Sequence, residues 1–234
     1  MEDIILVGYG GHAKSVADCI ECGKEFHIIG YTDSEKKQSP YPYLGADEVL
    51  EKYFYRGVHN ASICLGYLGK GTLREELYQQ LKQIGFHFPV IKDPSAIISK
   101  SATIGEGTFI GKGAIINAEA IIGKLCIINS AAVIEHECVV DDFSHISVGT
   151  VLCGQVMVGR AAFVGANATV IQGQKILPNQ IVGAGVTMRR EYMDNIVKTK
   201  EIFGGVIVDY ADSGWKHPVP MIFVCQWRGG LQWG

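Results

Sequence analysis

The sequence lacks a strong excess of either charge, a secretory signal at its start, and any apolar run long enough to cross a membrane. Its 21 Lys and Arg residues against 24 Asp and Glu residues give a net charge of −3. The two signs are interspersed, so nothing indicates a nucleic-acid-binding surface. Seven cysteines are scattered along the chain, an odd number. We therefore expect a cytoplasmic protein with reduced thiols, without a nucleic-acid partner and without membrane insertion.

One short cysteine motif, Cys19-x-x-Cys22, is present without a second pair and without histidines at ligand spacing. A metal or redox site is one interpretation of it. A partly buried helix face is the other, and it needs no further residues. We favour the helix face and predict no metal site.

The clearest pattern is an aliphatic residue at every sixth position, without a break or an insertion, from residue 98 to residue 182. The positions are Ile98, Ile104, Ile110, Ile116, Ile122, Ile128, Ile134, Val140, Ile146, Leu152, Val158, Val164, Val170, Ile176 and Val182. Small residues dominate four positions after each, and Gly, Asn, Asp or Ser often follows directly, as a turn requires. A period of six fits neither a helix nor simple strand alternation, and it predicts a parallel β-helix.

The segment before the repeats predicts a small α/β domain. Buried strands are expected at residues 3–9, 27–32, 61–66 and 88–91, and helices at residues 12–22 and from Thr72 to about Ile84. Thr72 with Glu75 has the spacing of a capping box. A full dinucleotide-binding fold needs about six strands, so we expect half of a Rossmann fold and consider a nicotinamide cofactor the weaker alternative.

The first strand ends in a glycine-rich turn, Gly8-x-Gly10-x-x-Ala13, which approximates the dinucleotide fingerprint. Strand, turn and helix N-terminus together predict an anion site made of backbone N–H groups. The second strand ends at Asp33, where such folds place an acidic ribose ligand.

Three segments, residues 6–18, 66–98 and 129–159, indicate which family of β-helix proteins the chain resembles. The motifs LVGYGGHAKSVAD and VIEHECVVDDFSH lie in the first and the third of them. They resemble one branch of the hexapeptide-repeat acyltransferases, the N-acetyltransferases of nucleotide-linked 4-amino sugars together with related sialic acid O-acetyltransferases. The resemblance implies a left-handed β-helix and an α/β domain that binds the sugar nucleotide. It also implies a homotrimer that binds acetyl-CoA between neighbouring subunits. We expect domains at residues 1–93 and 94–188, and an atypical tail at 189–234.

The same resemblance assigns roles to individual residues. His136 matches the base that removes a proton from the sugar amine, and Glu137 matches the residue that orients it. Glu135 or Asp141 are alternatives for that second role. For acetyl-CoA the matching residues are Asn129, His145, Gly154, Gly165 and Ala184. The competing interpretation is a solvated corner residue for His136 and a wall residue bonded to the backbone for His145. For Gly154, Gly165 and Ala184 it is the turn geometry of the repeat alone.

At the nucleotide end, Gly10, Gly11 and His12 are expected to meet the diphosphate, and Asp33 the uridine or ribose. Lys70, in a glycine-containing loop, is a weaker candidate for phosphate or sugar.

The predicted function is acetyl transfer from acetyl-CoA to the 4-amino group of a nucleotide-linked 4-amino-4,6-dideoxy sugar, expected to be UDP-linked, in bacterial glycan or surface-polysaccharide synthesis. O-acetylation of sialic acid is the rival enzyme activity. A non-catalytic β-helix scaffold that binds a nucleotide sugar is the rival outside enzymes. The tail, which contains all three tryptophans, departs from the family pattern. It is predicted either to cap the open end of the solenoid, to be disordered, or to be a read-through of altered sequence.

Overall fold

The computed structural model describes residues 1–67, 69, 71–189, 199–202 and 205–208. The chain divides into two compact units, residues 1–189 and 190–234. In the second unit, β22 (Thr199–Ile202) pairs with β23 (Gly205–Val208) in an antiparallel ladder. The rest of the predicted tail lies outside the described residues, including the tryptophans Trp215, Trp227 and Trp233.

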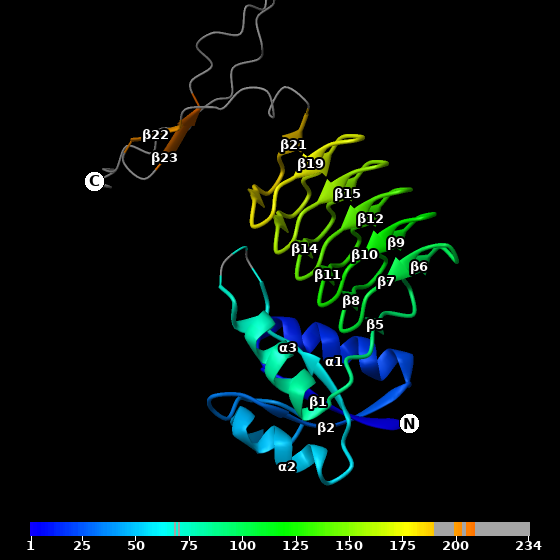
Figure 1. Ribbon diagram of the computed structural model, residues 1–234, viewed down its shortest axis with the longest axis vertical. Coiled ribbons are helices and arrows are strands. Elements are labelled where there is room, and N and C mark those ends of the chain that lie inside the picture. Colours follow the sequence, from blue (N-terminus) through cyan, green and yellow to red (C-terminus); the bar gives the residue numbers. More distant parts are fainter. Residues whose placement is uncertain (68, 70, 190–198, 203–204, 209–234) are drawn as a thin grey trace, which may run out of the picture. The chain divides into compact units, whose positions relative to one another are not determined.

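The first unit begins with a four-stranded parallel sheet in the order β3-β2-β1-β4. Its strands are β1 (Glu2–Val7), β2 (Phe26–Thr32), β3 (Tyr43–Gly45) and β4 (Asn60–Ile63). The connecting helices are α1 (Gly11–Gly23), the 3₁₀ turn η1 (Asp47–Val49), α2 (Leu50–Phe54) and α3 (Leu73–Ile84). This arrangement confirms the predicted half of a Rossmann fold, with β2 and β1 as the inner strands and β4 at the edge beside β1 (Figure 1).

The central strand β1 is apolar on both faces because each face of the sheet is covered. Ile4 and Leu6 pack in a buried cluster with Ala13, Val16 and Ile20 of α1. Ile5 and Val7, which point the other way, pack with Leu50 and with residues of α3. A run of four fully buried aliphatic residues is what a parallel strand enclosed by helices requires.

The second part of this unit is a left-handed parallel β-helix of about five turns (Figure 1). Each strand has two residues, and strands three apart in the chain pair in parallel. Three sheets result, one for each side of a triangular coil, in the orders β19-β16-β13-β10-β7, β20-β17-β14-β11-β8-β5 and β21-β18-β15-β12-β9-β6. The strands are β5 (Ile91–Lys92), β6 (Ile97–Ile98), β7 (Thr103–Ile104), β8 (Phe109–Ile110), β9 (Ile115–Ile116), β10 (Ile121–Ile122), β11 (Ile127–Ile128), β12 (Val133–Ile134), β13 (Val139–Val140), β14 (His145–Ile146), β15 (Val151–Leu152), β16 (Met157–Val158), β17 (Phe163–Val164), β18 (Thr169–Val170), β19 (Lys175–Ile176), β20 (Ile181–Val182) and β21 (Thr187–Met188).

The second residue of each strand is the repeated aliphatic residue, and these residues fill the interior of the coils. All of the predicted positions belong to or pack against one core cluster, and from Ile110 to Val182 each is at most 5% exposed. The predicted repeat and its fold are therefore confirmed. The removal of this column from water is the main term that stabilises the solenoid.

Where the small residue at a corner is Thr, Ser or Cys, its side chain contacts a backbone carbonyl of the solenoid. Thr108 Oγ1 donates to the Gly123 carbonyl at 2.8 Å, and Thr150 Oγ1 donates to the Gly165 carbonyl at 2.9 Å. Ser144 makes the same contact, and the thiols of Cys126 and Cys138 approach the equivalent carbonyls. Each donor lies fifteen residues before its acceptor, so the hydroxyls and thiols pair inward carbonyls that water cannot reach.

The α/β part packs against one side of the solenoid, the sheet that starts with β5. Ile91, Phe109 and Ile127 point outward from that sheet and join the buried cluster of α1. Tyr67 Oη donates to the Ala161 carbonyl at 2.7 Å, and Lys112 is paired with Asp18 of α1. Among the described residues, the buried clusters that join the α/β part to the solenoid include none from the opposite corner of the triangular coil, between the other two sheets.

Three details of the prediction are wrong. The strand expected at 88–91 is not part of the first sheet: β5 begins at Ile91 and pairs with β8 as the first strand of the solenoid. The fourth strand of the first sheet is the short β3, which no periodic pattern marked. The capping box is absent because Thr72 has helical backbone angles and its hydroxyl contacts the Glu76 carboxylate instead. The domain boundary between residues 93 and 94 stays a prediction.

Candidate functional site

His136 lies on the corner between β12 and β13, and Glu137 holds its ring. Glu137 has a left-handed backbone (φ 58°), and its Oε2 lies 2.9 Å from Nδ1 of His136. Next to a carboxylate, Nδ1 carries the proton and donates it, so the lone pair of the neutral ring is on Nε2. In the described part of the chain, the Glu135 carboxylate accepts a hydrogen bond only from the backbone N–H of His136, and the Asp141 carboxylate accepts the N–H of Asp142. Of the three predicted candidates, Glu137 is the one at the ring.

Gly154 lies one coil after His136, directly beneath the imidazole. A Cβ on Gly154 would stand 2.6 Å from both Cε1 and Nε2 of His136, so any larger residue would displace the ring. The Gly154 N–H has no hydrogen-bond partner among the described residues. A glycine here leaves both the ring and an unused N–H group at the same corner.

His145 has a different environment, since it is 6% exposed and both ring nitrogens are engaged. Nδ1 lies 2.5 Å from the Tyr67 carbonyl, so it carries the proton, and Nε2 lies 3.3 Å from the Asn129 amide nitrogen. Burial, opposed by the hydrogen bond to Tyr67 and aided by the charge of Arg74, lowers the pKa of His145 to about 4. His145 is a neutral wall residue that joins Asn129 to the α/β part.

The residues predicted for acetyl-CoA form two groups on one chain. Gly154 shares its corner with His136, between the sheets of β12 and β13. Asn129, Gly165 and Ala184 lie at the next corner, between the sheets of β11 and β12. Roughly six residues of extended chain, on the order of 20 Å, separate the two corners. A single chain does not bring the predicted set together.

Packing explains why residue 165 is a glycine, because a Cβ there would lie 2.5 Å from the backbone nitrogen of Ala184. The Gly165 N–H already donates to the Val182 carbonyl at 2.9 Å. Ala184 is exposed, and its own N–H has no partner among the described residues. Of these two residues, only Ala184 has a backbone donor to offer to a ligand.

The glycine-rich turn after β1 has open space in front of it. A Cβ on Gly10 or on Gly11 would meet nothing within 4 Å. Gly10 has extended backbone angles that other residues also adopt. Neither packing nor conformation therefore requires glycine, whereas close approach of a ligand would. The first turn of α1 contains no acidic residue, so its free N–H groups can meet an anion.

His12 is partly buried, with its ring edge-on to Phe109 at 5.0 Å. Burial, with smaller effects of Arg74 and His145, lowers the pKa of His12 to about 3. The ring is therefore neutral at physiological pH and offers a phosphate a hydrogen bond but no charge.

Asp33 ties the end of β2 to the glycine-rich turn, because its Oδ2 accepts the Tyr9 N–H at 2.9 Å. Burial alone would raise the pKa of Asp33, but hydrogen bonds from Tyr9 and Ser34 and the charge of Lys37 hold it below its usual value. Asp33, which is predicted to bind the ribose, is thus ionised. One of its carboxylate oxygens already accepts a hydrogen bond from the backbone of the same chain. Lys70 lies outside the described residues.

Sequence reasoning did not find the tyrosines around Asp33. The rings of Tyr9 and Tyr31 have centroids 4.5 Å apart, and Tyr41 and Tyr43 flank them. The Tyr43 hydroxyl donates to the Asp33 carbonyl. A concentration of tyrosine in residues 9–43 was the available signal.

Arg74 in α3 is a further residue that the sequence did not reveal. It is 6% exposed, and its Nη2 donates to the Leu125 carbonyl at 2.6 Å. Nε and Nη1 are shielded from solvent and have no partner among the described residues. Burial lowers the pKa of Arg74 to about 10, so the side chain stays charged. Burial is the main reason that His12 and His145 have lowered pKa values, and the charge of Arg74 lowers both further.

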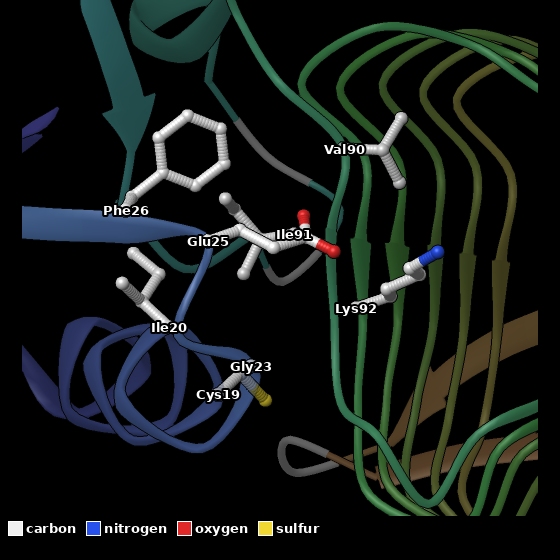
Figure 2. A pocket seen from close by; sticks show the side chains of 8 residues that line it. All are labelled: Cys19, Ile20, Gly23, Glu25, Phe26, Val90, Ile91 and Lys92. Atoms are coloured by element: carbon white, nitrogen blue, oxygen red, sulfur yellow. The ribbon is translucent and has the colours of Figure 1, made fainter. Parts of the chain in front are cut away.

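Two hollows in the surface lie away from the predicted residues. Figure 2 shows one between the end of α1, the start of β2 and β5, lined by Cys19, Ile20, Gly23, Glu25, Phe26, Val90, Ile91 and Lys92. The other lies at the N-terminus of α3, lined by Tyr67, Gly71, Thr72, Arg74, Glu75, Phe143, Arg160, Ala161 and Asn179. None of the predicted site residues lines either hollow.

Cys19 is buried and Cys22 is exposed, and both are free thiols. Both lie in α1, so the motif is on a helix face, and the Cys19 thiol donates to the Asp93 carboxylate at 3.4 Å. In the described ranges, no three His, Cys, Asp or Glu side chains are close enough together to hold a metal ion. No helix in that part of the chain has the length and apolarity to cross a membrane.

Comparison with known proteins gives three kinds of match. Residues 3–81 match the family model described as the PglD N-terminal domain. UDP-N-acetylbacillosamine N-acetyltransferase of Bacillus subtilis (strain 168) is 35% identical over 113 residues, which are 47% of this chain and 51% of that protein. The match thus spans about half the length of that curated relative.

The matches to solved structures extend over more of the chain. Perosamine N-acetyltransferase from Caulobacter crescentus, solved as a mutant with CoA and GDP-perosamine, is 32% identical with a TM-score of 0.76. That match covers 81% of this chain and 90% of the other. The acetyltransferase domain of PglB from Neisseria gonorrhoeae FA1090, solved with acetyl coenzyme A, is 26% identical with a TM-score of 0.75, over 80% and 91% of the two chains.

Proposed function

Because this chain belongs to the hexapeptide-repeat family of nucleotide-sugar N-acetyltransferases, we propose that it transfers the acetyl group of acetyl-CoA to the 4-amino group of a nucleotide-linked 4-amino-4,6-dideoxy sugar. The product would serve bacterial glycan or surface-polysaccharide synthesis. Two matching relatives are named UDP-N-acetylbacillosamine N-acetyltransferase and perosamine N-acetyltransferase, the second solved with CoA and GDP-perosamine. The single observation that carries the proposal on this chain is the His136–Glu137 pair, an oriented imidazole at an open corner of the solenoid.

The proposed chemistry is direct transfer. The lone pair of the sugar amine attacks the thioester carbonyl carbon, and the carbonyl π electrons move to the oxygen. Nε2 of His136 takes the amine proton, since Nδ1 is occupied by Glu137. Collapse of the tetrahedral intermediate forms the amide bond and breaks the C–S bond. The CoA thiolate leaves and takes up the proton that the imidazolium holds.

The acetyl-CoA site follows from unused backbone donors. The Gly154 N–H is next to His136 and has no partner in the described part of the chain, so it suits the developing oxyanion. Asn129, His145, Gly165 and Ala184 would line the remainder of the bound co-substrate. The neutral, Tyr67-bonded state of His145 suits a wall residue and does not suit a second base.

A homotrimer with active sites between subunits accounts for the distribution of these residues. The α/β part packs on one side of the solenoid, and His136 lies on the opposite corner. A sugar held at Gly10, Gly11, His12 and Asp33 would therefore meet His136 of a neighbouring subunit. Apolar residues point outward on the two sheets that flank His136, namely Ile97, Ile115, Val133 and Val151 on one and Ile121, Val139 and Met157 on the other. Such columns suit a subunit interface.

The nucleotide would lie over the glycine-rich turn, with its diphosphate at the N-terminus of α1. Asp33 and the tyrosines beside it would receive the ribose or the base. We propose UDP first and GDP second, since the matching relatives act on a UDP-linked and a GDP-linked sugar respectively. No described feature favours O-acetylation of sialic acid or a non-catalytic scaffold over this activity.

The test is thiol release from acetyl-CoA with a panel of acceptors, namely a UDP-linked 4-amino sugar, a GDP-linked 4-amino sugar, and free and CMP-linked sialic acid. Turnover with a 4-amino sugar is expected, and His136→Ala should reduce kcat by about 100-fold or more. His27→Ala, which changes an exposed histidine of the α/β part, should leave it unchanged. Turnover with sialic acid alone would replace the proposal by O-acetylation. Accumulation of acetylated Cys138 or Cys153 would contradict direct transfer.

A further inference from the structure

The Glu137 carboxylate has a second partner besides the imidazole. Nε2 of Gln155 lies 3.2 Å from Oε2 of Glu137, the same oxygen that accepts Nδ1–H of His136 at 2.9 Å. One carboxylate oxygen has two lone pairs and can accept both hydrogens. The three side chains therefore form a chain of hydrogen bonds, from Gln155 through Glu137 to His136.

The repeat explains why Gln155 reaches Glu137. The two residues are eighteen positions apart and occupy the same corner of successive coils, which lie about 4.8 Å apart. Both have the left-handed backbone conformation, with φ of 58° for Glu137 and 61° for Gln155. The Gln155 N–H donates to the His136 carbonyl at 2.9 Å, so the backbone fixes the register as well.

We propose that Gln155 is a positioning residue that holds the Glu137 carboxylate against Nδ1 of His136 and so keeps Nε2 free to take the proton. The proposal rests on the proposed function. The side chains of His136 and Glu137 are 49% and 48% exposed, so water competes for the contact between them. When Gln155 holds the Glu137 carboxylate from a second side, Glu137 no longer adopts the rotamers in which its carboxylate is away from the imidazole. An amide is suited to this position because it donates, whereas a second carboxylate would repel Glu137.

Kinetics of three single variants test the role. Gln155→Ala should lower kcat about 3- to 10-fold, the value of one such hydrogen bond, with the KM of both substrates unchanged. Gln155→Glu should lower kcat further, because it replaces the donor by a like charge. Glu119→Ala is the matched control, since Glu119 occupies the same corner one coil earlier with φ 60°. This control should keep the wild-type kcat.

A double-mutant cycle separates positioning from general loss of structure. In a Glu137→Ala background, Gln155→Ala should cause no further loss of kcat, because the carboxylate it holds is gone. Equal losses in both backgrounds would overturn the proposal. So would a Gln155→Ala enzyme with the kcat of the wild type.

A readout without turnover distinguishes this proposal from the proposed function. In protein with ¹⁵N-labelled histidine, His136 should be protonated on Nδ1 in the wild type and in Glu119→Ala, and should become a mixture of tautomers in Gln155→Ala. An unchanged tautomer in Gln155→Ala would overturn the role of Gln155 even if the wild type acetylates a 4-amino sugar. If the wild type acetylates nothing, the proposed function fails, while the same spectra still decide whether Gln155 holds the pair.

Discussion

His136 and His145 carry the same side chain in opposite surroundings, nine residues apart. His136 stands half-exposed at a corner with one nitrogen bonded to a carboxylate and the other open. His145 is buried, with one nitrogen on a backbone carbonyl and the other on an amide. An imidazole with a free nitrogen can move a proton, whereas one with both nitrogens engaged joins two parts of the structure. Environment alone separates the proposed base from a structural histidine.

The buried state of His145 predicts how stability depends on pH. Its pKa is about 4 in the folded protein and about 6.5 in an unfolded chain, so below pH 6.5 the unfolded chain binds a proton that the folded chain does not. The contribution of His145 to the free energy of unfolding is complete above about pH 6.5 and decreases as pH falls towards 4. The slope approaches about 1.4 kcal/mol per pH unit, and the whole effect is roughly 3 kcal/mol.

The measurement is the free energy of unfolding by denaturant between about pH 7 and about pH 4.5. His145→Gln should have a shallower slope than the wild type over that range. Equal slopes in the two proteins would show that His145 takes up its proton in the folded state.

At the scale of elements, the hydroxyl and thiol contacts at the corners predict which small residues matter. Thr108 Oγ1 donates to the Gly123 carbonyl at 2.8 Å and accepts the Cys126 N–H at 3.0 Å, and Thr108 is fully buried. Thr108→Val keeps the shape and leaves two buried backbone groups unpaired, so it should destabilise by about 2 kcal/mol or more. Thr103→Val, on the exposed outward side of β7, should change stability by less than about 0.5 kcal/mol. Similar melting temperatures for the two variants would contradict the role of the hydroxyl.

The sequence predicted elements that depend on local pattern and missed those that depend on distant partners. The aliphatic period located the solenoid because every coil repeats one environment. The strand at Ile91 was assigned to the wrong sheet because a two-residue strand has no period of its own, and its partner Phe109 is eighteen residues away. The short β3 was not predicted because it, too, has no period of its own.

The candidate site shows the same limit. The motif around His136 identified the proposed base, but the choice of Glu137 over Glu135 depends on a left-handed backbone at the corner. No local pattern could show that the Tyr67 carbonyl reaches His145, since 78 residues separate them. The buried charge of Arg74 was equally hidden, because a helix periodicity does not reveal that an arginine faces the solenoid.

At the scale of the whole molecule, the separation of His136 from the glycine-rich turn predicts complementation between inactive variants. His136→Ala keeps an intact nucleotide site, and Gly11→Trp fills the open space at that site while it keeps His136. If each active site combines the α/β part of one subunit with His136 of another, a mixed trimer contains some sites without either defect. For random mixing of equal amounts, each interface draws its two subunits independently. About a quarter of the sites should then be intact.

The experiment unfolds and refolds the two variants together and compares N-acetyl transfer with that of each variant refolded alone. Activity near a quarter of the refolded wild type is expected in the mixture, and close to none in either variant. The control has two parts: co-refolded wild type and Gly11→Trp should recover about half of the wild-type activity, because half of the α/β parts are intact, and native mass spectrometry of the mixture should detect trimers that contain both variants. A mixture as inactive as its components, with that control behaving as stated, would place both halves of the site on one chain. That result would contradict the geometry in which the α/β part and His136 lie on opposite sides of the solenoid.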